Sequence, residues 1–509
     1  MVEKQINYIP ARYIFAVLLT LFEVLCMIGI VVTLCYYVPY FYLLCWVTEI
    51  VCIINVIASD DNPDYKVPWL LFIMILPIAG FMLYFLFYSR RLPKKYIKRL
   101  KAVKRNMYIL ENEELWKRLH LEDKVAYNQA TLLCKTSDCD LFGDTEQTYF
   151  SSGELMWQSM LRDLKSAERF IFMEYFIIKE GEFWGSIYEI LKAKSALGVE
   201  VYLVYDDIGC MSTLPGNYAK KLRKDGIKGV PFSRLKGNAD GEFNNRSHRK
   251  IAVIDGFIAY TGGVNLADEY INRIQPFGYW KDVGIRLEGC AVWGLTRLFL
   301  IDYGINAKAI ELPPEVLYPK QNINHRQGYL IPFGDGPNPL YTHRVGKGII
   351  QSMVESANEY VYVTTPYLII DNDLCQCFEN AALKGIDVRI IVPHIPDKKI
   401  IFSMTRSFYT RLMAAGVKVY EYKPGFIHAK MYIADGKYGM IGTINLDYRS
   451  LVHHFENGIW MYNCEAVTDM RRDVESILEQ CIPIKKEELQ ASLLQRLFRS
   501  LVRIFAPLL

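Results

Sequence analysis

Three long apolar stretches open the chain. Residues 13–37 and 41–58 each contain a single glutamate, and residues 69–88 contain no charge at all. Each stretch can cross the hydrocarbon core of a bilayer, which takes ~20 residues. We predict three membrane spans. Two is the alternative, with 13–58 forming one hairpin or a re-entrant pair.

After residue 145 the pattern changes to short apolar, β-branched runs that alternate with helical stretches. The run at 166–178 resembles the run at 356–370, and 198–207 resembles 385–394. Helical patterns at 185–196 and 373–384 separate the runs within each pair. Alternating strands and helices indicate β-α-β units, which favour α/β lobes with largely parallel sheets.

A polar motif also occurs twice, 180 residues apart, with the same internal spacing. In both copies Lys follows His by two residues, Asp by seven and Asn by seventeen. The first copy contains His248, Lys250, Asp255 and Asn265, and the second contains His428, Lys430, Asp435 and Asn445. Such agreement predicts two half-sites that face each other across a pseudo-two-fold axis.

Each motif also predicts a local structure. Asp-Gly between two apolar runs is typical of a tight β-hairpin. Because side chains alternate along a strand, His248 and Lys250 share one face, and Arg249 points to the other. We interpret Asp255 and Asp435 as turn residues, although they belong to the motif. The return strand should bring the asparagines back beside the histidines and lysines.

Two imidazoles, two ammonium groups and two carboxamides suit a phosphoryl group. The lysines and asparagines can hold its oxygens, while one histidine attacks phosphorus and the other protonates the departing alkoxide. A nucleophilic histidine needs a carboxylate on its other ring nitrogen. The candidates are Asp282 and Glu456, which follow the histidines of their own copies by 34 and 28 residues.

The repeated H-x-K-x4-D pattern resembles the phospholipase D superfamily, and the whole layout resembles its bacterial cardiolipin synthases. The resemblance implies a metal-independent phosphatidyl transferase without cofactors. Two phosphatidylglycerol molecules would give cardiolipin and glycerol through a phosphohistidine. It also implies that His248 is the nucleophile and His428 the acid. Hydrolysis, or transfer to another alcohol, is the alternative; a nuclease or a scaffold with degenerate sites fits less well.

Charge distribution predicts orientation and partners. Residues 90–105 hold nine Lys or Arg and no acid, whereas 59–67 are acidic. The positive-inside rule therefore places the lobes in the cytoplasm, under a multi-pass anchor in the cell membrane. Because the whole chain has a net charge of +4, the rest of it carries −5. This excludes a basic nucleic-acid surface and favours anionic membrane lipids as partners; protein partners cannot be predicted.

These observations divide the chain into five segments. They are a transmembrane region (1–90), a basic juxtamembrane linker (91–145) that is irregular from 106, two lobes (146–335 and 336–485), and a basic amphipathic C-terminal helix (486–509). We expect that helix to lie in the membrane interface, with packing on the second lobe as the alternative. The twelve cysteines lack metal-ligand spacing. We expect His453 and His454 to flank Glu456 rather than bind a metal.

Overall fold

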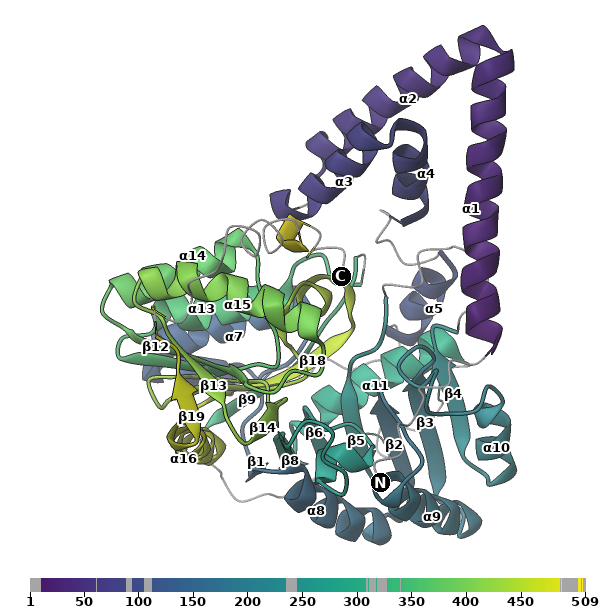
Figure 1. Ribbon diagram of the computed structural model, residues 1–509. Helices are drawn as coiled ribbons and strands as arrows, with labels where there is room; N and C mark the ends of the chain where they lie inside the picture. Colours follow the sequence, from purple (N-terminus) through teal and green to yellow (C-terminus); the bar gives the residue numbers. More distant parts are fainter. Residues whose placement is uncertain are drawn as a thin grey trace.

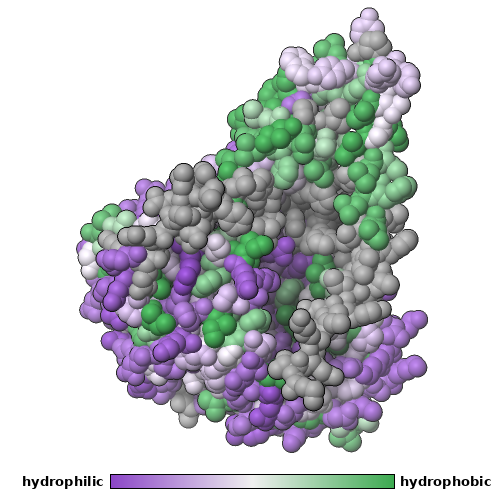
Figure 2. Space-filling view, viewed as in Figure 1, coloured by the Kyte–Doolittle hydropathy of each residue, from purple (hydrophilic) through white to green (hydrophobic). Residues whose placement is uncertain are grey.

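The computed structural model describes residues 11–60, 62–87, 94–104, 112–234, 245–307, 327–338 and 340–485, together with 310, 317, 487, 502–504 and 506. An arm of apolar helices rises from two lobes that each contain a β-sheet (Figure 1). Hydrophobic residues gather on the arm, whereas hydrophilic residues cover much of the lobes (Figure 2). The predicted α/β class, with two similar lobes behind an apolar helical region, is confirmed.

Four helices form the arm: α1 (Ala11–Tyr37), α2 (Pro39–Ala58), α3 (Pro63–Ile75) and α4 (Pro77–Phe87). Within the described residues, one helix (Tyr40–Ala58) is long and apolar enough to cross a membrane. It corresponds to the predicted span 41–58. In α1 the described apolar part, Ile28–Tyr37, is shorter.

The predicted span 69–88 is not one continuous helix. The chain breaks at Leu76, because the following proline has no backbone N–H to continue α3, and α4 packs back against it. Gly80 permits this close approach, since a Cβ there would lie 2.2 Å from the carbonyl oxygen of Phe72. Neither half reaches ~20 residues, the length needed for a span.

The part of the linker expected to be irregular, from 106, contains two helices instead, α6 (Glu113–Glu122) and α7 (Lys124–Ser137). The basic part before it contains α5 (Lys94–Lys104). Asn112 and Asp123 cap α6 and α7 by accepting backbone N–H groups. Leu100 and Val103 of α5 are buried, so the basic segment packs on the first lobe in its described part.

The first lobe is built on a seven-stranded sheet in the order β1-β8-β6-β5-β2-β3-β4. Its strands are β1 (Thr145–Phe150), β2 (Phe170–Tyr175), β3 (Glu200–Asp206), β4 (Lys228–Phe232), β5 (Lys250–Ile254), β6 (Ile258–Gly262) and β8 (Gly284–Gly289). Its helices are α8 (Gly153–Ser166), α9 (Glu182–Ala196), α10 (Tyr218–Lys224), η1 (Asp268–Ile271) and α11 (Val292–Asn306). The helix predicted at 185–196 lies within α9.

The second lobe repeats this arrangement in an eight-stranded sheet, β19-β13-β12-β10-β15-β16-β18-β9. Its strands are β9 (Tyr329–Asp335), β10 (Tyr360–Thr364), β12 (Asp387–Pro393), β13 (Lys418–Tyr422), β15 (Met431–Ala434), β16 (Tyr438–Gly442), β18 (Glu456–Tyr462) and β19 (Cys481–Pro483). Its helices are α13 (Val345–Ser356), α14 (Asn372–Leu383), α15 (Lys399–Ala414), η2 (Arg449–His453) and α16 (Glu465–Glu479). Apart from β19, the two sheets have the same strand order. A short pair, β11 (Leu368–Ile369) and β17 (Leu446–Asp447), lies outside the main sheet.

The sheets are mixed rather than largely parallel. In the first, β2, β3 and β4 are parallel, as the β-α-β pattern predicted, whereas β5, β6, β8 and β1 pair antiparallel. The Asp-Gly hairpin accounts for the antiparallel β5–β6 pair, because a tight turn can only join antiparallel strands. In the second sheet, β10, β12 and β13 are likewise parallel, and β15, β16, β18 and β9 antiparallel.

The two lobes share a hydrophobic core. Helix α11 is buried along its length from Val292 to Ile305, and its apolar side chains join those of both sheets in one continuous cluster. At the C-terminus, Arg503 stacks on Phe408 of α15, 4.4 Å from the ring centroid, and Ala506 is buried. This end of the chain therefore contacts the second lobe; most of the predicted C-terminal helix lies outside the described residues.

Candidate active site

The two lobes meet where short strands from one pair with strands from the other. Strand β7 (Tyr279–Lys281) of the first lobe runs parallel to β14 (Gly425–Ile427) of the second. On the opposite side of the pseudo-axis, Ser247 forms a bridge with Phe455. The backbone N–H of His428 donates to Lys281 O over 2.7 Å, and that of His248 donates to Phe455 O over 2.8 Å. Each motif histidine is thus held by the backbone of the other lobe.

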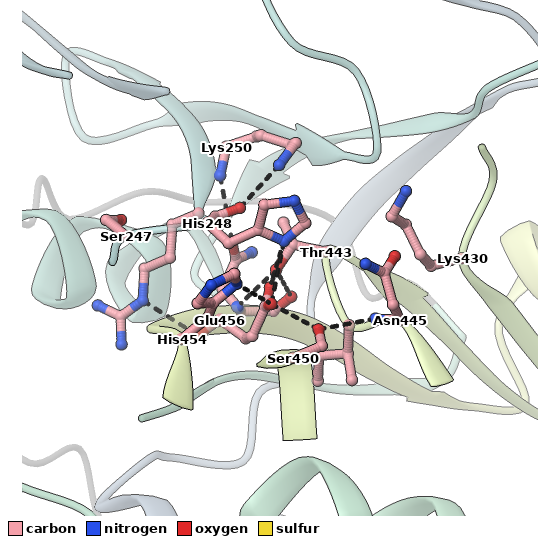
Figure 3. Close-up of polar contacts among 12 residues, drawn as sticks. Ser247, His248, Lys250, Lys430, Thr443, Asn445, Ser450, His454 and Glu456 are labelled. Atoms are coloured by element: carbon pink, nitrogen blue, oxygen red, sulfur yellow. Dashed lines mark hydrogen bonds and ion pairs between the residues drawn. The ribbon is translucent and has the colours of Figure 1, made fainter. Parts of the chain in front are cut away.

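The side chain of His248 also reaches across this seam. Its Nδ1 lies 3.0 Å from both carboxylate oxygens of Glu456, which is fully buried (Figure 3). Ser450 donates to Oε1 of Glu456 over 2.5 Å, and Thr443 donates to Oε2. Because Nδ1 carries the proton in this bond, Nε2 is the ring atom with a free lone pair.

The second half-site follows the same principle with different partners. Nδ1 of His428 lies 2.7 Å from Oδ2 of Asp282, and Oδ1 of Asp282 accepts the backbone N–H of Val283. Three aromatic rings surround His428: Tyr270 and Trp280, each at 5.5 Å between centroids, and Phe426 at 6.0 Å. These contacts fix the imidazole both in tautomer and in orientation.

The carboxylates are therefore exchanged between the copies. Their sequence spacing paired Asp282 with His248 and Glu456 with His428, and this pairing is wrong. Asp282 follows β7, which pairs with β14 of the second lobe, and Glu456 follows Phe455, which bridges to Ser247 of the first. Each acid therefore faces the histidine of the opposite lobe. Each of the two acids does contact a motif histidine.

A difference between the two motifs explains how each half-site accommodates its acid. A Cβ at Gly263 would lie 2.0 Å from Oδ1 of Asp282, so no side chain fits there. The equivalent Thr443 instead donates its hydroxyl to Glu456. Sequence reasoning missed Thr443 and Ser450, which both donate to Glu456. The second motif has Thr443 where the first has Gly263. The change itself was the available signal.

Both motif lysines are buried beside the histidines. Lys250 Nζ donates to His248 O over 2.8 Å, and Lys430 Nζ donates to His428 O. Burial lowers the pKa of Lys250 to about 8 and that of Lys430 to about 7, although nearby carboxylates oppose the shift. Each lysine uses one N–H in these bonds, so its protonated form can still donate to an anion.

The motif asparagines make contacts within the protein. Asn265 accepts the backbone N–H of Ile177 over 3.1 Å and donates to the Tyr270 hydroxyl over 2.7 Å. Asn445 donates to Asp447 over 3.0 Å, and its buried Oδ1 lacks a hydrogen-bond partner among the residues that the structure describes. Figure 3 places Asn445 close to Lys430. Direct binding of phosphate by these carboxamides stays a prediction.

The motif aspartates act on the backbone. Asp255 has φ +53° and accepts the N–H groups of residues 168–170, each over 2.8 Å. Asp435 has φ +52° and accepts those of residues 358–360 over 2.8–3.1 Å. Both lie at the hairpin turns, so their carboxylates connect each turn to the start of the neighbouring strand.

The charges around the two histidines differ. Burial, and then the positive charges of Lys250 and Lys430, hold the pKa of His248 well below its usual range. Burial and Lys430 lower the pKa of His428 to about 4 against the opposing effect of Asp282. Burial raises the pKa of Glu456, whereas His428 and Lys430 outweigh burial at Asp282 and lower its pKa. Asp282, the partner of His428, is therefore more fully ionised than Glu456, the partner of His248.

Comparison with known proteins agrees with this architecture. Residues 160–275 and 350–478 match the family described as cardiolipin synthase, PLD-like domain, and residues 50–87 match the phospholipase D-nuclease N-terminal family. An uncharacterised protein of Streptococcus mutans is 40% identical over 466 residues, which cover 90% of this chain and 99% of the relative.

Several relatives carry a functional name. A cardiolipin synthase of Alkalihalophilus pseudofirmus is 33% identical, covering 90% of this chain and 91% of its own. One of Halalkalibacterium halodurans is 31% identical, covering 92% and 94%. Among solved structures, a phosphatidylserine synthase of Haemophilus influenzae matches with a TM-score of 0.57 at 15% identity, over 75% of this chain and 97% of its own. At that identity the match supports the fold alone.

Proposed function

Because this chain belongs to the phospholipase D-like cardiolipin synthase family, we propose that it transfers a phosphatidyl group from one phosphatidylglycerol to another, producing cardiolipin and glycerol. One observation carries the proposal: two buried histidines, each bound at Nδ1 to a carboxylate of the opposite lobe, meet at a seam that also holds two lysines.

In the first step, Nε2 of His248 attacks the phosphorus atom of a bound phosphatidylglycerol. The bond from phosphorus to the headgroup glycerol breaks, and His428 gives its proton to the departing oxygen. The product is a phosphatidyl group on His248. Glu456 stabilises the positive imidazole ring of this intermediate, much as a carboxylate does in a catalytic triad.

In the second step, the terminal hydroxyl of another phosphatidylglycerol enters. His428 takes its proton, the oxygen attacks phosphorus, and the bond to His248 breaks. Lys250 and Lys430 hold the non-bridging oxygens and offset the negative charge that develops in both steps. Asn265 and Asn445 help to orient the phosphate group. Asp255 and Asp435 support the hairpins of the two motifs.

The different charges of the half-sites support these roles for the histidines. A nucleophile must be neutral, and His248 has the pKa that is held well below its usual range. A general acid must be stabilised while it carries a proton. Burial and Lys430 lower the pKa of His428 to about 4 in the free protein, and Asp282, 2.7 Å away with a lowered pKa, opposes this shift. The negative charge of a bound phosphodiester would oppose it further and favour the imidazolium form.

We also propose a multi-pass membrane anchor with cytoplasmic lobes. The apolar helix Tyr40–Ala58 and the match of 50–87 to a family N-terminal segment support the anchor. The nine basic residues at 90–105 support the orientation. In this arrangement anionic membrane lipids are both substrates and surroundings, so the phosphate groups remain at the membrane surface.

Hydrolysis is the second candidate, because water can replace the acceptor hydroxyl without a change in the catalytic groups. Another alcohol could do so equally, since acceptor choice depends on the surrounding loops. The deciding experiment supplies purified full-length protein in liposomes with labelled phosphatidylglycerol. Cardiolipin with free glycerol supports the transferase, phosphatidic acid supports hydrolysis, and a new lipid on addition of ethanolamine supports a different acceptor.

Two controls test the mechanism in the same assay. His248→Ala should abolish transfer while the protein stays folded, because the covalent intermediate cannot form; full activity in this variant contradicts the mechanism. Transfer should persist in EDTA, since none of the proposed steps uses a metal ion. Loss of activity in EDTA would instead indicate a metal enzyme.

A further inference from the structure

A third imidazole lies beside the first half-site. The ring of His454 is 5.6 Å from that of His248 between centroids, and its Nδ1 is 3.8 Å from Oε1 of Glu456. Figure 3 shows His454 and Glu456 together on the side of His248 that faces away from Lys430. The steps proposed above do not use His454.

Together, His248, His454 and Glu456 form a potential metal-binding group. One ligand atom from each residue lies within 4.8 Å of the other two, and Nδ1 of His248 is already 3.0 Å from Glu456. Two imidazoles and one carboxylate are a common set of zinc ligands, with bond lengths of about 2.0–2.2 Å. Atoms bound tetrahedrally at that radius are about 3.4 Å apart, so a modest rotation of His454 would complete the set.

The residues around this group hold it in place. Ser450 and Thr443 orient Glu456, and the backbone N–H of His454 donates to Arg449 O over 2.9 Å. Such supporting bonds are typical of metal centres, where they fix the ligands before the ion arrives. Glu456 and His248 are buried and His454 is half-buried, so a bound ion would be shielded on most sides.

We propose that His248, His454 and Glu456 bind a zinc-class dication and that this ion inhibits the enzyme. A neutral imidazole carries one proton, which Nδ1 of His248 shares with Glu456 in the active form. If a metal ion takes Nδ1, that proton moves to Nε2. Nε2 then has no lone pair with which to attack phosphorus. The inhibition rests on the proposed function, whereas the binding of the metal does not.

The ion should bind one half-site only. In the part of the chain that the structure describes, this is the one group of three such ligands. The equivalent space beside His428 is taken by the rings of Tyr270 and Trp280, which offer no metal-binding nitrogen. One ion per chain is therefore expected.

The site should also select the type of metal. Imidazole ligands favour Zn²⁺, Co²⁺, Ni²⁺ and Cu²⁺, whereas Mg²⁺ and Ca²⁺ prefer oxygen ligands. The positive charges of Lys250 and Lys430 repel every dication. Only an ion that binds imidazole strongly should therefore overcome this repulsion. Magnesium thus provides a control for effects of divalent cations on the anionic lipids themselves.

Cobalt tests binding without any measurement of activity. Full-length protein in detergent, prepared without a histidine tag, is titrated with Co²⁺, and the visible absorption of tetrahedral cobalt is recorded. The wild type should show these bands at one equivalent, and His454→Asn should weaken Co²⁺ binding at least ~10-fold. His453→Asn, in the neighbouring histidine, and His428→Asn, in the other half-site, should retain wild-type affinity.

Two results would overturn the site: no tetrahedral spectrum from the wild type, or equal cobalt affinity in the His454→Asn protein. The inhibition is tested separately, with the rate of each protein taken relative to its own rate in EDTA. Zn²⁺ should lower the relative rate of the wild type more than that of His454→Asn, and Mg²⁺ should affect both alike. Equal inhibition of the two proteins by Zn²⁺ contradicts the inhibitory role. If no variant acts on phosphatidylglycerol, the proposed function fails while the cobalt result still stands.

Discussion

His248 of the first lobe is bound to Glu456 of the second, with its Nδ1 3.0 Å from both carboxylate oxygens. The reciprocal bond joins His428 to Asp282 over 2.7 Å. Each half-site therefore takes its histidine from one lobe and its carboxylate from the other. The two acids should have separable effects, because one serves the proposed nucleophile and the other the proposed acid.

Substrates with different leaving groups should distinguish the two carboxylates. Asp282→Asn should slow transfer from phosphatidylglycerol by ~10²–10⁴-fold, the usual contribution of general acid catalysis. A phosphodiester with a nitrophenol leaving group needs no proton in the first step, so the first-turnover release of nitrophenol should recover most of this loss. The second step stays slow, because it still needs His428 as base. Glu456→Gln should release nitrophenol slowly as well, because it misorients His248. First-turnover rates with the two substrates measure this, and equal recovery in both variants contradicts the assignment.

The two motifs differ at Gly263 and Thr443, and exchanging these residues should affect the two half-sites differently. Gly263→Thr should disrupt the first motif, because its Cβ would collide with the carboxylate of Asp282. Thr443→Gly introduces no clash and removes one hydrogen bond to Glu456. We expect soluble, folded Thr443→Gly protein with a rate reduced by roughly tenfold, from the loss of about 1.5 kcal/mol. Circular dichroism and the transfer rate check this pair; a fully active Gly263→Thr protein would refute the packing argument.

The motif aspartates should matter for stability more than for chemistry. Asp255→Ala removes the acceptor of three backbone N–H groups and places alanine at a left-handed φ. The expected loss in unfolding free energy is roughly 2–3 kcal/mol. Asparagine tolerates this φ and keeps one acceptor oxygen, so Asp255→Asn should lose less unfolding free energy. Thermal unfolding in detergent measures both, with the rate per folded molecule at low temperature as the control. A stable but inactive Asp255→Ala protein contradicts a turn role.

The pH profile of kcat/KM should be shifted toward acid. Lys430 and Lys250 have pKa values lowered to about 7 and about 8, so their positive charges are present below these values and lost as pH rises. His428 acts as the acid only while it is protonated, and its pKa in the free protein is lowered to about 4, so kcat/KM should already fall as the pH rises from 5. It should fall more steeply above pH 7–8, where the lysines lose their charge. The pKa of His248 is held well below its usual range, so the nucleophile stays neutral until the pH is well below 6.5. Rates between pH 5 and 9 test this, and a constant rate up to pH 9 contradicts it.

Removing either motif lysine should reduce the rate of transfer while the protein stays folded. Lys250→Ala and Lys430→Ala should each cost ~100-fold or more, by analogy with the loss of an oxyanion donor. Lys347→Ala offers a matched control, because Lys347 pairs with Asp371 and Asp373 instead of belonging to a motif. Equal losses in all three variants would indicate a general effect on stability.

The repeated motif predicted much of the fold, and the histidines and lysines that it names lie at the seam between the lobes. Its spacing alone indicated two similar lobes, two hairpins and the buried pairs of histidine and lysine. This succeeded because hairpin turns and strand alternation are local properties of the sequence. The direction of the Arg249 side chain followed from the same alternation: it points away from the histidines to bond with Asp302 over 2.9 Å.

Non-local features could not be predicted in this way. The exchange of Asp282 and Glu456 depends on how strands from two lobes cross, which no spacing within one copy encodes. The break at Leu76 depends on α4 packing against α3, and hydropathy alone does not register such packing. Residues 112–137 form helices that are capped by Asn112 and Asp123, signals that are easily overlooked in a polar segment.

The crossed pairing at the seam also makes the site depend on both lobes being complete. Glu456 follows His248 by 208 residues, so a nascent chain that stops before residue 456 has a histidine without its carboxylate. Its apolar helices could already occupy the bilayer at that stage. A half-made chain anchored among lipids would thus be chemically silent, and activity would begin only once the second lobe has been made.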